Sequence, residues 1–259
     1  MSMRMLPARL SVFRAPWFFG LLVLTALVLH PGVASAQQQM SKRFPAGNSI
    51  RLVIRNISGK VIVESWDRSE VKITATIESP AANVAPKQLR DGVMVDVMGD
   101  NRGRGDIGNV NFKIQVPANF IVDIETRMGD ITIANIRSKQ VRAHVTSEGD
   151  IELIGIVASE VFAQNLSGNI FFDGEVSRGG SYQFQSGKGD ISIRIPASSV
   201  FDLNASALDK KLALGGFWNS GFRTVGEGQR FSKTTVDVND GRAKLVIRNF
   251  EGGITFVRR

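Results

Sequence analysis

The chain has 259 residues and a formal net charge of +8, and with 43% hydrophobic and 22% charged residues its composition supports a buried core and excludes a disordered chain. It contains no cysteine, which excludes disulfides, thiolate metal sites and a cysteine nucleophile, and its two histidines are too few for a histidine-rich metal centre. Glycine is frequent, with 26 residues, and proline is scarce, with 8, which favours many turns over long helices.

The first 36 residues have the layout of a secretory signal peptide. A basic segment without acids precedes an apolar run over 17–29, and the small residues Ala34, Ser35 and Ala36 follow. The basic residues are Arg4, Arg9 and Arg14. In a helix, an apolar run of this length spans about 20 Å, which is short of the roughly 30 Å hydrocarbon core of a membrane. We therefore expect cleavage after Ala36, with an uncleaved membrane anchor as the alternative.

Export and charge together limit the partners. Cleavage removes 36 of the 259 residues and three arginines, which leaves 223 residues and lowers the net charge from +8 to +5. Export excludes nucleic acid as a natural partner, although the pI is near 10.1. A modest positive charge suits anionic lipids or acidic glycans of the envelope, and it equally suits an ordinary solvated surface. No second apolar run approaches 18 residues, so we expect no transmembrane helix in the mature chain and place it in the periplasm or at the cell surface.

Four glycine-containing steps recur at nearly equal spacing. They are Gly129-Asp130, Gly149-Asp150, Gly168-Asn169 and Gly189-Asp190, at intervals of 20, 19 and 21 residues. Each step lies between two runs of alternating apolar and polar residues, which are typical of half-buried strands. Glycine takes the positive-φ turn, and the Asp or Asn beside it bonds the local backbone. A regular period of this size predicts a solenoid with one coil per repeat.

Weaker copies of the pattern flank this block. One contains Ser58-Gly59, another covers 236–247, and a last strand is expected at 253–256. Around Val141 and Ala143 the alternation slips by one residue relative to its glycine, which predicts a β-bulge.

The repeats define the expected domain organisation. We expect a signal peptide over 1–36, a flexible lead-in over 37–49 and one all-β domain over 50–259. The predicted domain is a β-solenoid similar to a parallel β-helix, with two-strand coils of about 20 residues. A β-sandwich is the alternative, because short strands separated by turns suit it too. Equal spacing favours the solenoid.

Two segments depart from the repeat. In 79–110 we expect a short helical turn over 81–91 and a protruding loop over 99–109. The loop carries Arg102 and Arg104, which either contact anionic headgroups or glycans or are simply solvated. Residues 206–235 contain aromatic side chains among glycines, which form either an adhesive tip or a cap over the open end of the solenoid. These aromatic residues are Phe217, Trp218 and Phe222, and with the two arginines they are the candidate binding surface.

Two groups of acidic residues are candidates for chemistry. The turn residues Asp130, Asp150, Asn169 and Asp190 form a ladder. We interpret this ladder as turn chemistry, because the glycine-rich nonapeptide of calcium-binding β-rolls is absent. A further group is Asp123, Glu125, Glu148, Asp150 and Glu152, among which alternation places Glu125 and Glu152 outward as solvated residues. His144 lies in a strand with no nucleophile motif and is expected at a surface or edge. We predict no catalytic, cofactor or metal site.

Several short phrases resemble the bacterial "putative adhesin" β-strand-repeat family. They are Asn56-Ile57-Ser58-Gly59-Lys60-Val61, Val116-Pro117-Ala118, Met128-Gly129-Asp130-Ile131 and Ser167-Gly168-Asn169-Ile170. The resemblance covers roughly 50–257 and implies a β-solenoid domain, an envelope location and no known catalytic residues. Met128, Glu148 and Lys188 stand where the family has serine before glycine, which changes the chemistry of the turn edge and leaves the fold expectation intact.

These observations lead to three hypotheses for function. The first is an exported, non-enzymatic binding or adhesion module of the bacterial envelope, whose partner is an anionic lipid, a glycan or an envelope protein. The second is an accessory or scaffold protein of the envelope stress response. The third is a glycan-active β-helix enzyme, which requires two or three acids converging on one outward strand face.

Overall fold

The computed structural model describes residues 37–46, 51–208, 212–217, 222–228, 231–238 and 242–259, without the side chains of 208, 222–228 and 231–238. Contacts divide the chain into Met1–Ala34 and Ser35–Arg259. The first unit, like the expected cleavage site after Ala36, lies outside the described residues. The described part of the second unit is almost entirely strand, and none of its helices is long and apolar enough to cross a membrane.

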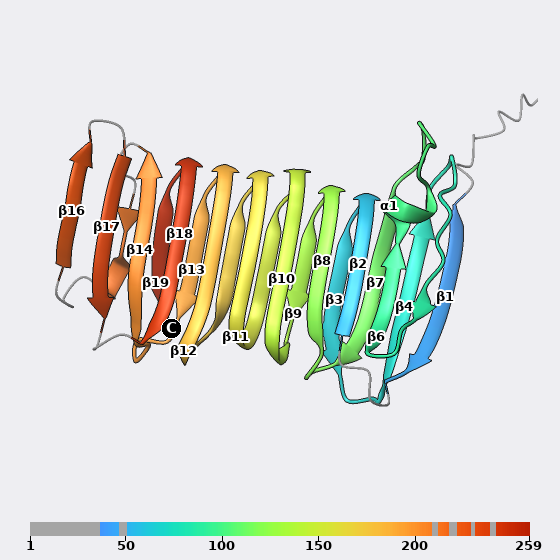
Figure 1. Cartoon of the computed structure of the whole chain (residues 1–259), viewed down its shortest axis with the longest axis horizontal. Coiled ribbons are helices and arrows are strands. Elements are labelled where there is room, and N and C mark those ends of the chain that lie inside the picture. Colours follow the sequence, from blue (N-terminus) through green and yellow to red (C-terminus); the bar gives the residue numbers. More distant parts are fainter. Residues whose placement is uncertain (1–36, 47–50, 209–211, 218–221, 229–230, 239–241) are drawn as a thin grey trace, which may run out of the picture. The chain divides into compact units, whose positions relative to one another are not determined.

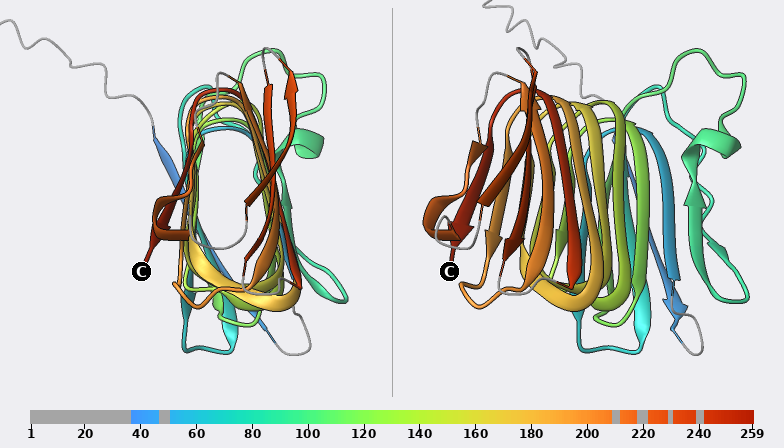
Figure 2. Two further views of the ribbon diagram at one scale, coloured as in Figure 1. Left: turned by 90° about the vertical axis from the view of Figure 1, so that its left-hand side faces the viewer. Right: turned by 60° about the vertical axis from the view of Figure 1, so that its left-hand side comes forward.

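The strands of this unit form two sheets that face each other (Figures 1 and 2). Sheet 1 has the order β1 (Gln38–Pro45), β4 (Glu70–Ile77), β7 (Val110–Pro117), β3 (Val61–Trp66), β9 (Ile131–Ala134), β11 (Ile151–Ser167), β12 (Ile170–Lys188), β13 (Ile191–Ile195), β19 (Ile254–Arg258) and β15 (Leu212–Ala213). Sheet 2 has the order β5 (Lys87–Gln88), β6 (Gly92–Asp96), β2 (Arg51–Ser58), β8 (Ile121–Met128), β10 (Arg137–Glu148), β11, β12, β18 (Ala243–Glu251), β14 (Phe201–Leu208), β17 (Phe231–Val238) and β16 (Phe222–Gly228). The long strands β11 and β12 belong to both sheets, because each begins in sheet 1 and bends into sheet 2.

Alternating sequence produces the core between the sheets. Val122 and Ile124 of β8 are fully buried, and so are Ile131 and Ile133 of β9, which faces β8 across the core. Two strands alone cannot shield these side chains, and the neighbouring coils complete their burial. The hydrophobic core is therefore shared along the stack of coils.

The predicted all-β solenoid is confirmed. In the middle of the stack neighbouring strands are parallel, and the chain passes to the opposite sheet after each strand or by bending within one. A β-sandwich is excluded because its hairpin connections give antiparallel neighbours. Antiparallel pairs occur among the described strands only near the two ends of the stack, at β1–β4–β7, β5–β6 and β14–β17–β16. The predicted bulge in β10 is also confirmed, since the register with both neighbours shifts between Val145 and Glu148.

The first and last coils do not occupy the ends of the stack. In sheet 2, β2 lies between β6 and β8, and β18 lies between β12 and β14. In sheet 1, β3 lies between β7 and β9, and β19 lies between β13 and β15. Figure 1 shows the red β18 between the orange strands β12 and β14. Each terminal coil is thus inserted within the stack, with strands of other segments outside it, which the repeat spacing alone does not predict.

Before the regular coils, the structure differs from the expectations in two places. Residues 38–45, expected within a flexible lead-in, form the edge strand β1, which pairs with β4 along its whole length. The helical turn is α1 (Val97–Asp100) rather than part of 81–91, because the carboxylate of Asp96 caps it by accepting a hydrogen bond from the Gly99 N–H. Residues 87–88 instead form the short strand β5.

The aromatic group near the other end is partly interior. Phe217 ends the 3-10 turn η1 (Gly215–Phe217) and is 2% exposed. Its ring lies 5.8 Å from that of Phe201 and 6.2 Å from that of Phe256. Phe217 therefore packs into the core and is not available to a binding surface, which corrects that part of the expectation. Trp218 and the side chain of Phe222 lie outside the described residues.

Candidate functional site

The repeat glycines form a ladder along one edge of the solenoid. Gly59, Gly129, Gly149, Gly168, Gly189 and Gly252 have φ values between 105° and 154°. A Cβ atom on Gly149 would lie 2.2 Å from the carbonyl oxygen of Gly129 in the neighbouring coil. The ladder therefore requires glycine for both its backbone conformation and its close packing.

The Asx residues beside these glycines join one turn to the next. The Oδ1 atom of Asp130 accepts a hydrogen bond of 3.1 Å from the N–H of Asp150, and Asp150 accepts one of 2.6 Å from Asn169. The series continues in the next two turns. The Oδ1 atom of Asn169 accepts a hydrogen bond from the N–H of Asp190, and the Oδ1 atom of Asp190 accepts one from the N–H of Gly253. These side-chain oxygens thus bond the backbone, and no group of three potential metal ligands occurs among the described residues.

A second polar row lies inside the same turns and was not singled out from the sequence. Its buried members are Asn56, Thr126, Asn165, Ser186 and Asn249. Asn165 donates to the carbonyl of Gly149, and Ser186 donates to the carbonyl of Gly168. Each member stands three residues before a ladder glycine, at a position that alternation assigns to the core. A polar residue at that spacing is the signal that predicts this row.

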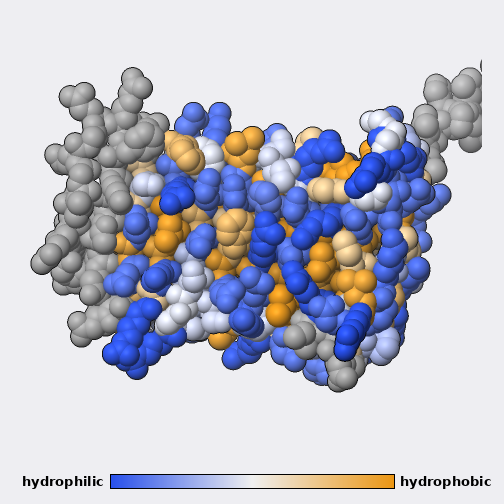
Figure 3. Space-filling model, viewed as in Figure 1, coloured by the Kyte–Doolittle hydropathy of each residue, from blue (hydrophilic) through white to orange (hydrophobic). Residues whose placement is uncertain are grey.

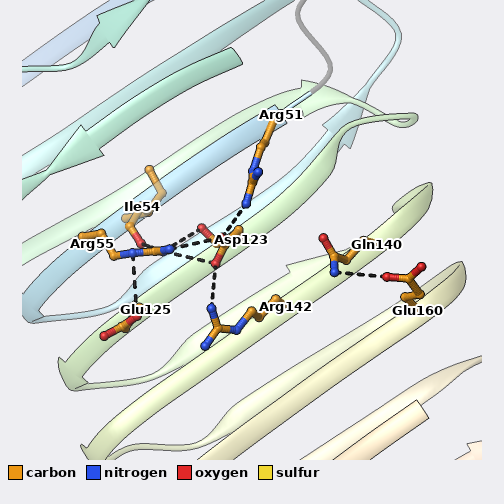
Figure 4. Close-up of polar contacts among 8 residues, drawn as sticks. All are labelled: Arg51, Ile54, Arg55, Asp123, Glu125, Gln140, Arg142 and Glu160. Atoms are coloured by element: carbon orange, nitrogen blue, oxygen red, sulfur yellow. Dashed lines mark hydrogen bonds and ion pairs between the residues drawn. The ribbon is translucent and has the colours of Figure 1, made fainter. Parts of the chain in front are cut away.

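A group of charged side chains gathers on the outer surface of sheet 2 (Figure 4). Asp123 of β8 is 4% exposed. Arg55 of β2 donates to both its oxygens at 3.1 Å, Arg51 donates at 2.9 Å, and a guanidinium nitrogen of Arg142 on β10 lies 3.9 Å away. The Nε of Arg55 also lies 3.7 Å from Glu125. The carboxylate of Asp123 thus joins three neighbouring strands.

The arginines decide the protonation of Asp123. Burial alone raises the pKa of this carboxyl, because desolvation disfavours the charged form. The hydrogen bonds and positive charges of Arg55, Arg51 and Arg142 act in the opposite direction and prevail. The pKa of Asp123 is therefore below its ordinary value, and the group is a carboxylate at neutral pH. It cannot serve as a general acid.

Next to this cluster, three strands of sheet 2 present nine outward side chains in register. The first row is Gln140, Glu160 and Ser181; the second is Arg142, Phe162 and Gln183; the third is His144, Gln164 and Gln185. Each row contains one residue from β10, one from β11 and one from β12. We call these nine residues the grid. Figure 3 shows the same face of the molecule, where hydrophobic residues lie between hydrophilic ones over the middle strands.

Two hollows open along the grid. The first, of about 540 Å³, is lined by the first and second rows together with Gly179. The second, of about 670 Å³, is lined by the third row and by residues nearer the glycine ladder, including Leu166 and Phe250. Both volumes lie within the range of small-ligand sites. The second and third rows are two residues apart on each strand, or roughly 7 Å, so the hollows are adjacent.

His144 has an unusual position in the third row. It is half-buried, its ring lies 6.4 Å from that of Phe162, and its Nδ1 atom is buried without a hydrogen-bond partner among the described residues. Desolvation lowers the pKa of the imidazole; Glu125 opposes this effect, and Arg142 and Arg55 add to it. His144 is therefore neutral at pH 7.

We expect the imidazole of His144 to titrate below pH 6.5 in the folded chain, as measured by NMR. Because folding lowers this pKa, the folded state binds the proton less well than the unfolded state does. The contribution to stability is complete above pH 6.5 and is lost as the pH falls below it. The only other histidine of the sequence is His30, so the signal is readily assigned. A midpoint at or above 6.5 would mean that the ring is solvated or paired with Glu125.

The two candidate arginines lie elsewhere. Arg102 and Arg104 follow α1 in the segment between β6 and β7, where both are exposed. A guanidinium nitrogen of Arg104 donates to Asn101 Oδ1 at 3.0 Å. Neither residue lines the two hollows, so the structure does not join these arginines to the grid.

Comparison with known proteins finds a family and several solved structures. Residues 106–210 match the family described as Toastrack DUF4097. A "putative cell adhesion protein" from Clostridium sporogenes is 11% identical, with 86% of this chain and 100% of that chain covered and a TM-score of 0.49. A "putative adhesin" from Bacteroides fragilis is 8% identical over 86% and 99%, with a TM-score of 0.37. A "putative lipid binding protein" from Parabacteroides distasonis is 11% identical over 85% and 97%, with a TM-score of 0.36.

No curated protein matches the chain. The matched segment 106–210 begins just before β7 and ends just after β14, and it contains four of the six ladder glycines and the whole grid. Residues 106–210 are thus similar to the Toastrack DUF4097 family, which confirms the resemblance to the adhesin-like β-strand-repeat family over this segment.

Proposed function

We propose that this protein is an exported, non-enzymatic binding module of the bacterial envelope and that its ligand binds the grid on sheet 2. The observation that carries the proposal is the pair of adjacent hollows over three successive coils, with side-chain amides that have no hydrogen-bond partner among the described residues. No described residue forms a hydrogen bond with the side chain of Gln164, Gln183 or Gln185. Amide groups held at a solvent-facing hollow without partners are free to bind a ligand.

The state of the nearby acids favours binding over catalysis. General acid–base chemistry needs a carboxyl group that can exchange a proton near the working pH. Asp123 is held as a carboxylate by arginines, and Glu125 pairs with Arg55. Glu160 accepts a hydrogen bond of 3.2 Å from Gln140 and lies 3.9 Å from the ammonium group of Lys139. These three acids therefore serve as ion-pair and hydrogen-bond partners.

Export is supported by the N-terminal sequence. The basic segment, the short apolar run and the small residues before Gln37 are the features that signal peptidases recognise. We propose that residues 1–36 are removed and that the mature chain acts in the periplasm or at the cell surface. In this organisation β1 is the first strand of the mature domain.

Site-directed photo-crosslinking in the producing cells tests this function. A photoreactive residue in place of Gln183 is expected to form adducts with an envelope component, because this position lies in the middle row of the grid. The same residue in place of Gln115, which faces outward on sheet 1, is the matched control and is expected to give none. N-terminal sequencing of the exported chain is expected to begin at Gln37.

Each outcome decides between the hypotheses. Adducts at Gln183 with a glycan or a lipid support the binding module. Adducts there with one envelope protein favour an accessory or scaffold role instead. Equal labelling at both positions, or catalytic turnover of an envelope glycan by the purified protein, would contradict the proposal.

A further inference from the structure

We infer that the ligand of the grid is a neutral, hydroxyl-rich glycan chain rather than an anionic lipid or a polyanion. This inference rests on the proposed function and names the chemical class of its ligand. Three properties of the grid carry it: compensated charge, amide groups that both donate and accept, and an apolar surface between them.

The charges of the grid cancel. Among its nine residues only Arg142 and Glu160 carry a formal charge at neutral pH. A guanidinium nitrogen of Arg142 lies 3.9 Å from Asp123, and Glu160 is paired with Lys139. The two charged residues that line the hollow nearer the ladder, Lys188 and Glu251, are again of opposite sign. An anionic headgroup would need several uncompensated cations, which the nine residues of the grid do not offer. The exposed Lys244 and Arg248 of β18 lie outside the grid, beside Ser181 and Gln185.

The free amides match hydroxyl groups. Each glutamine side chain offers one carbonyl acceptor and two N–H donors. Sulfate and phosphodiester groups only accept hydrogen bonds, so they would use the N–H donors of the glutamine amides and leave the carbonyl acceptors unused. Sugar hydroxyls donate and accept. Gln164 and Gln185 occupy adjacent strands in register, yet no hydrogen bond joins their amides, so both groups remain available.

An apolar surface lies between the amides. Phe162 occupies the centre of the grid, with the guanidinium of Arg142 5.2 Å from its ring centroid. The hollow nearer the ladder has apolar walls at Leu166 and Phe250, which are 62% and 47% exposed. A sugar ring has C–H faces as well as hydroxyl edges, so it can cover such side chains while its edges reach the amides.

The size of the grid fits several linked sugars. Four residue steps along a strand cover roughly 13 Å, and two strand spacings cover about 10 Å. The surface is an open trough rather than a closed pocket, since its two hollows are adjacent. We therefore expect an oligosaccharide to bind better than its monosaccharide unit, because only the longer ligand reaches both hollows at once.

Binding to a glycan array, with the exported chain purified from its cells, tests the inference. The panel contains neutral oligosaccharides, uronic-acid oligosaccharides and vesicles of anionic phospholipid, each at low and high salt. We expect binding to a neutral oligosaccharide that changes less than about twofold with salt, because salt screens only charged contacts. The double substitution Gln164→Ala/Gln185→Ala and the single substitution Phe162→Ala are each expected to weaken it about tenfold.

Matched variants on sheet 1 control for general damage. Gln115→Ala and Phe171→Ala replace outward residues of the same types on the opposite sheet, and both are expected to leave binding unchanged. Salt-sensitive binding to vesicles or uronates that the grid variants abolish would overturn the neutral-glycan inference and leave the proposed function standing. Glycan binding that the grid variants do not alter would overturn both. No binding to any neutral oligosaccharide would overturn the inference alone.

Discussion

Replacing Gly168 by alanine lowers the free energy of unfolding by more than about 3 kcal/mol, because two costs add at this position. The φ angle of Gly168 is +126°, in a region that residues with a Cβ atom rarely adopt. The new Cβ would also lie 2.3 Å from the carbonyl oxygen of Gly149 and 2.6 Å from its carbonyl carbon. Neither atom belongs to a flexible side chain, so the coils themselves must separate.

The separation weakens contacts on both sides of the turn. The carbonyl of Gly149 accepts a hydrogen bond of 3.0 Å from Asn165, and the N–H of Gly168 donates one of 2.8 Å to Lys188. Since stability in a solenoid comes from contacts between neighbouring coils, damage at this turn lowers the stability that the adjacent coils give one another. Urea denaturation followed by circular dichroism measures the loss.

Alanine substitutions at two glycines outside the ladder separate the backbone cost from the packing cost. Gly103 has φ of +85°, and an added Cβ atom would meet no other atom within 4 Å, so Gly103→Ala is expected to show the backbone cost of about 1 kcal/mol alone. Gly105 has open space and no positive φ, so Gly105→Ala is expected to be neutral or slightly stabilising. If Gly168→Ala is no more destabilising than Gly103→Ala, the inference that the turns of the ladder are closely packed is wrong.

The sequence predicts the middle of this fold well because its repeat is local. Alternation and the glycine steps identify the inward residues of β8–β13, and the slip around Ala143 identifies the bulge in β10. Such signals depend on residues that are near one another in the chain. The insertion of β2 between β6 and β8 depends on pairing between distant segments, and no local pattern encodes it.

The candidate site was harder to predict for the same reason. Arg142, Phe162 and Gln183 are about twenty residues apart in sequence and meet only because the coils stack in register. Unusual residues in irregular segments point instead to Arg102 and Phe217, of which the second is buried. In a solenoid, outward residues at the same position of successive repeats are the better guide to a surface.

Distant pairing also explains why buried charges occur where the terminal coils are inserted. Asp123 of β8 holds Arg51 and Arg55 of the inserted strand β2. At the other end, Asp173 of β12 is 4% exposed and binds Arg194 at 2.6 Å, and its other oxygen lies 3.6 Å from Arg259, the residue that follows β19. A buried carboxylate with two arginines specifies one neighbour among several similar coils, since a shifted coil would leave the charge unpaired.

Replacing Asp123 by asparagine is therefore expected to lower the free energy of unfolding by about 2–3 kcal/mol at neutral pH. Loss of one partner of a buried ion pair costs about 3–5 kcal/mol, and the partial exposure of Arg51 and Arg142, whose side chains are 42% and 37% exposed, reduces this figure. Asparagine keeps the shape of the side chain, so the loss reports the charge. Asp91→Asn, at an exposed position with no ion pair among the described residues, is the control and is expected to change stability by less than about 0.5 kcal/mol.

The pH dependence distinguishes this cause from a packing defect. The pKa of Asp123 is lower in the folded chain than its ordinary value, so the unfolded chain takes up the proton first as the pH falls. The stabilising contribution is complete above the ordinary carboxyl pKa of about 3.9 and is lost as the pH falls through the lower folded value. The difference between the original chain and Asp123→Asn must therefore shrink on acidification, as measured by urea denaturation at a series of pH values. A difference that stays constant with pH would mean that asparagine disturbs the packing and that the arginines contribute nothing through charge. Hydrogen exchange locates the effect: β2 is expected to lose more protection than β12, because β2 is the inserted strand that Asp123 holds.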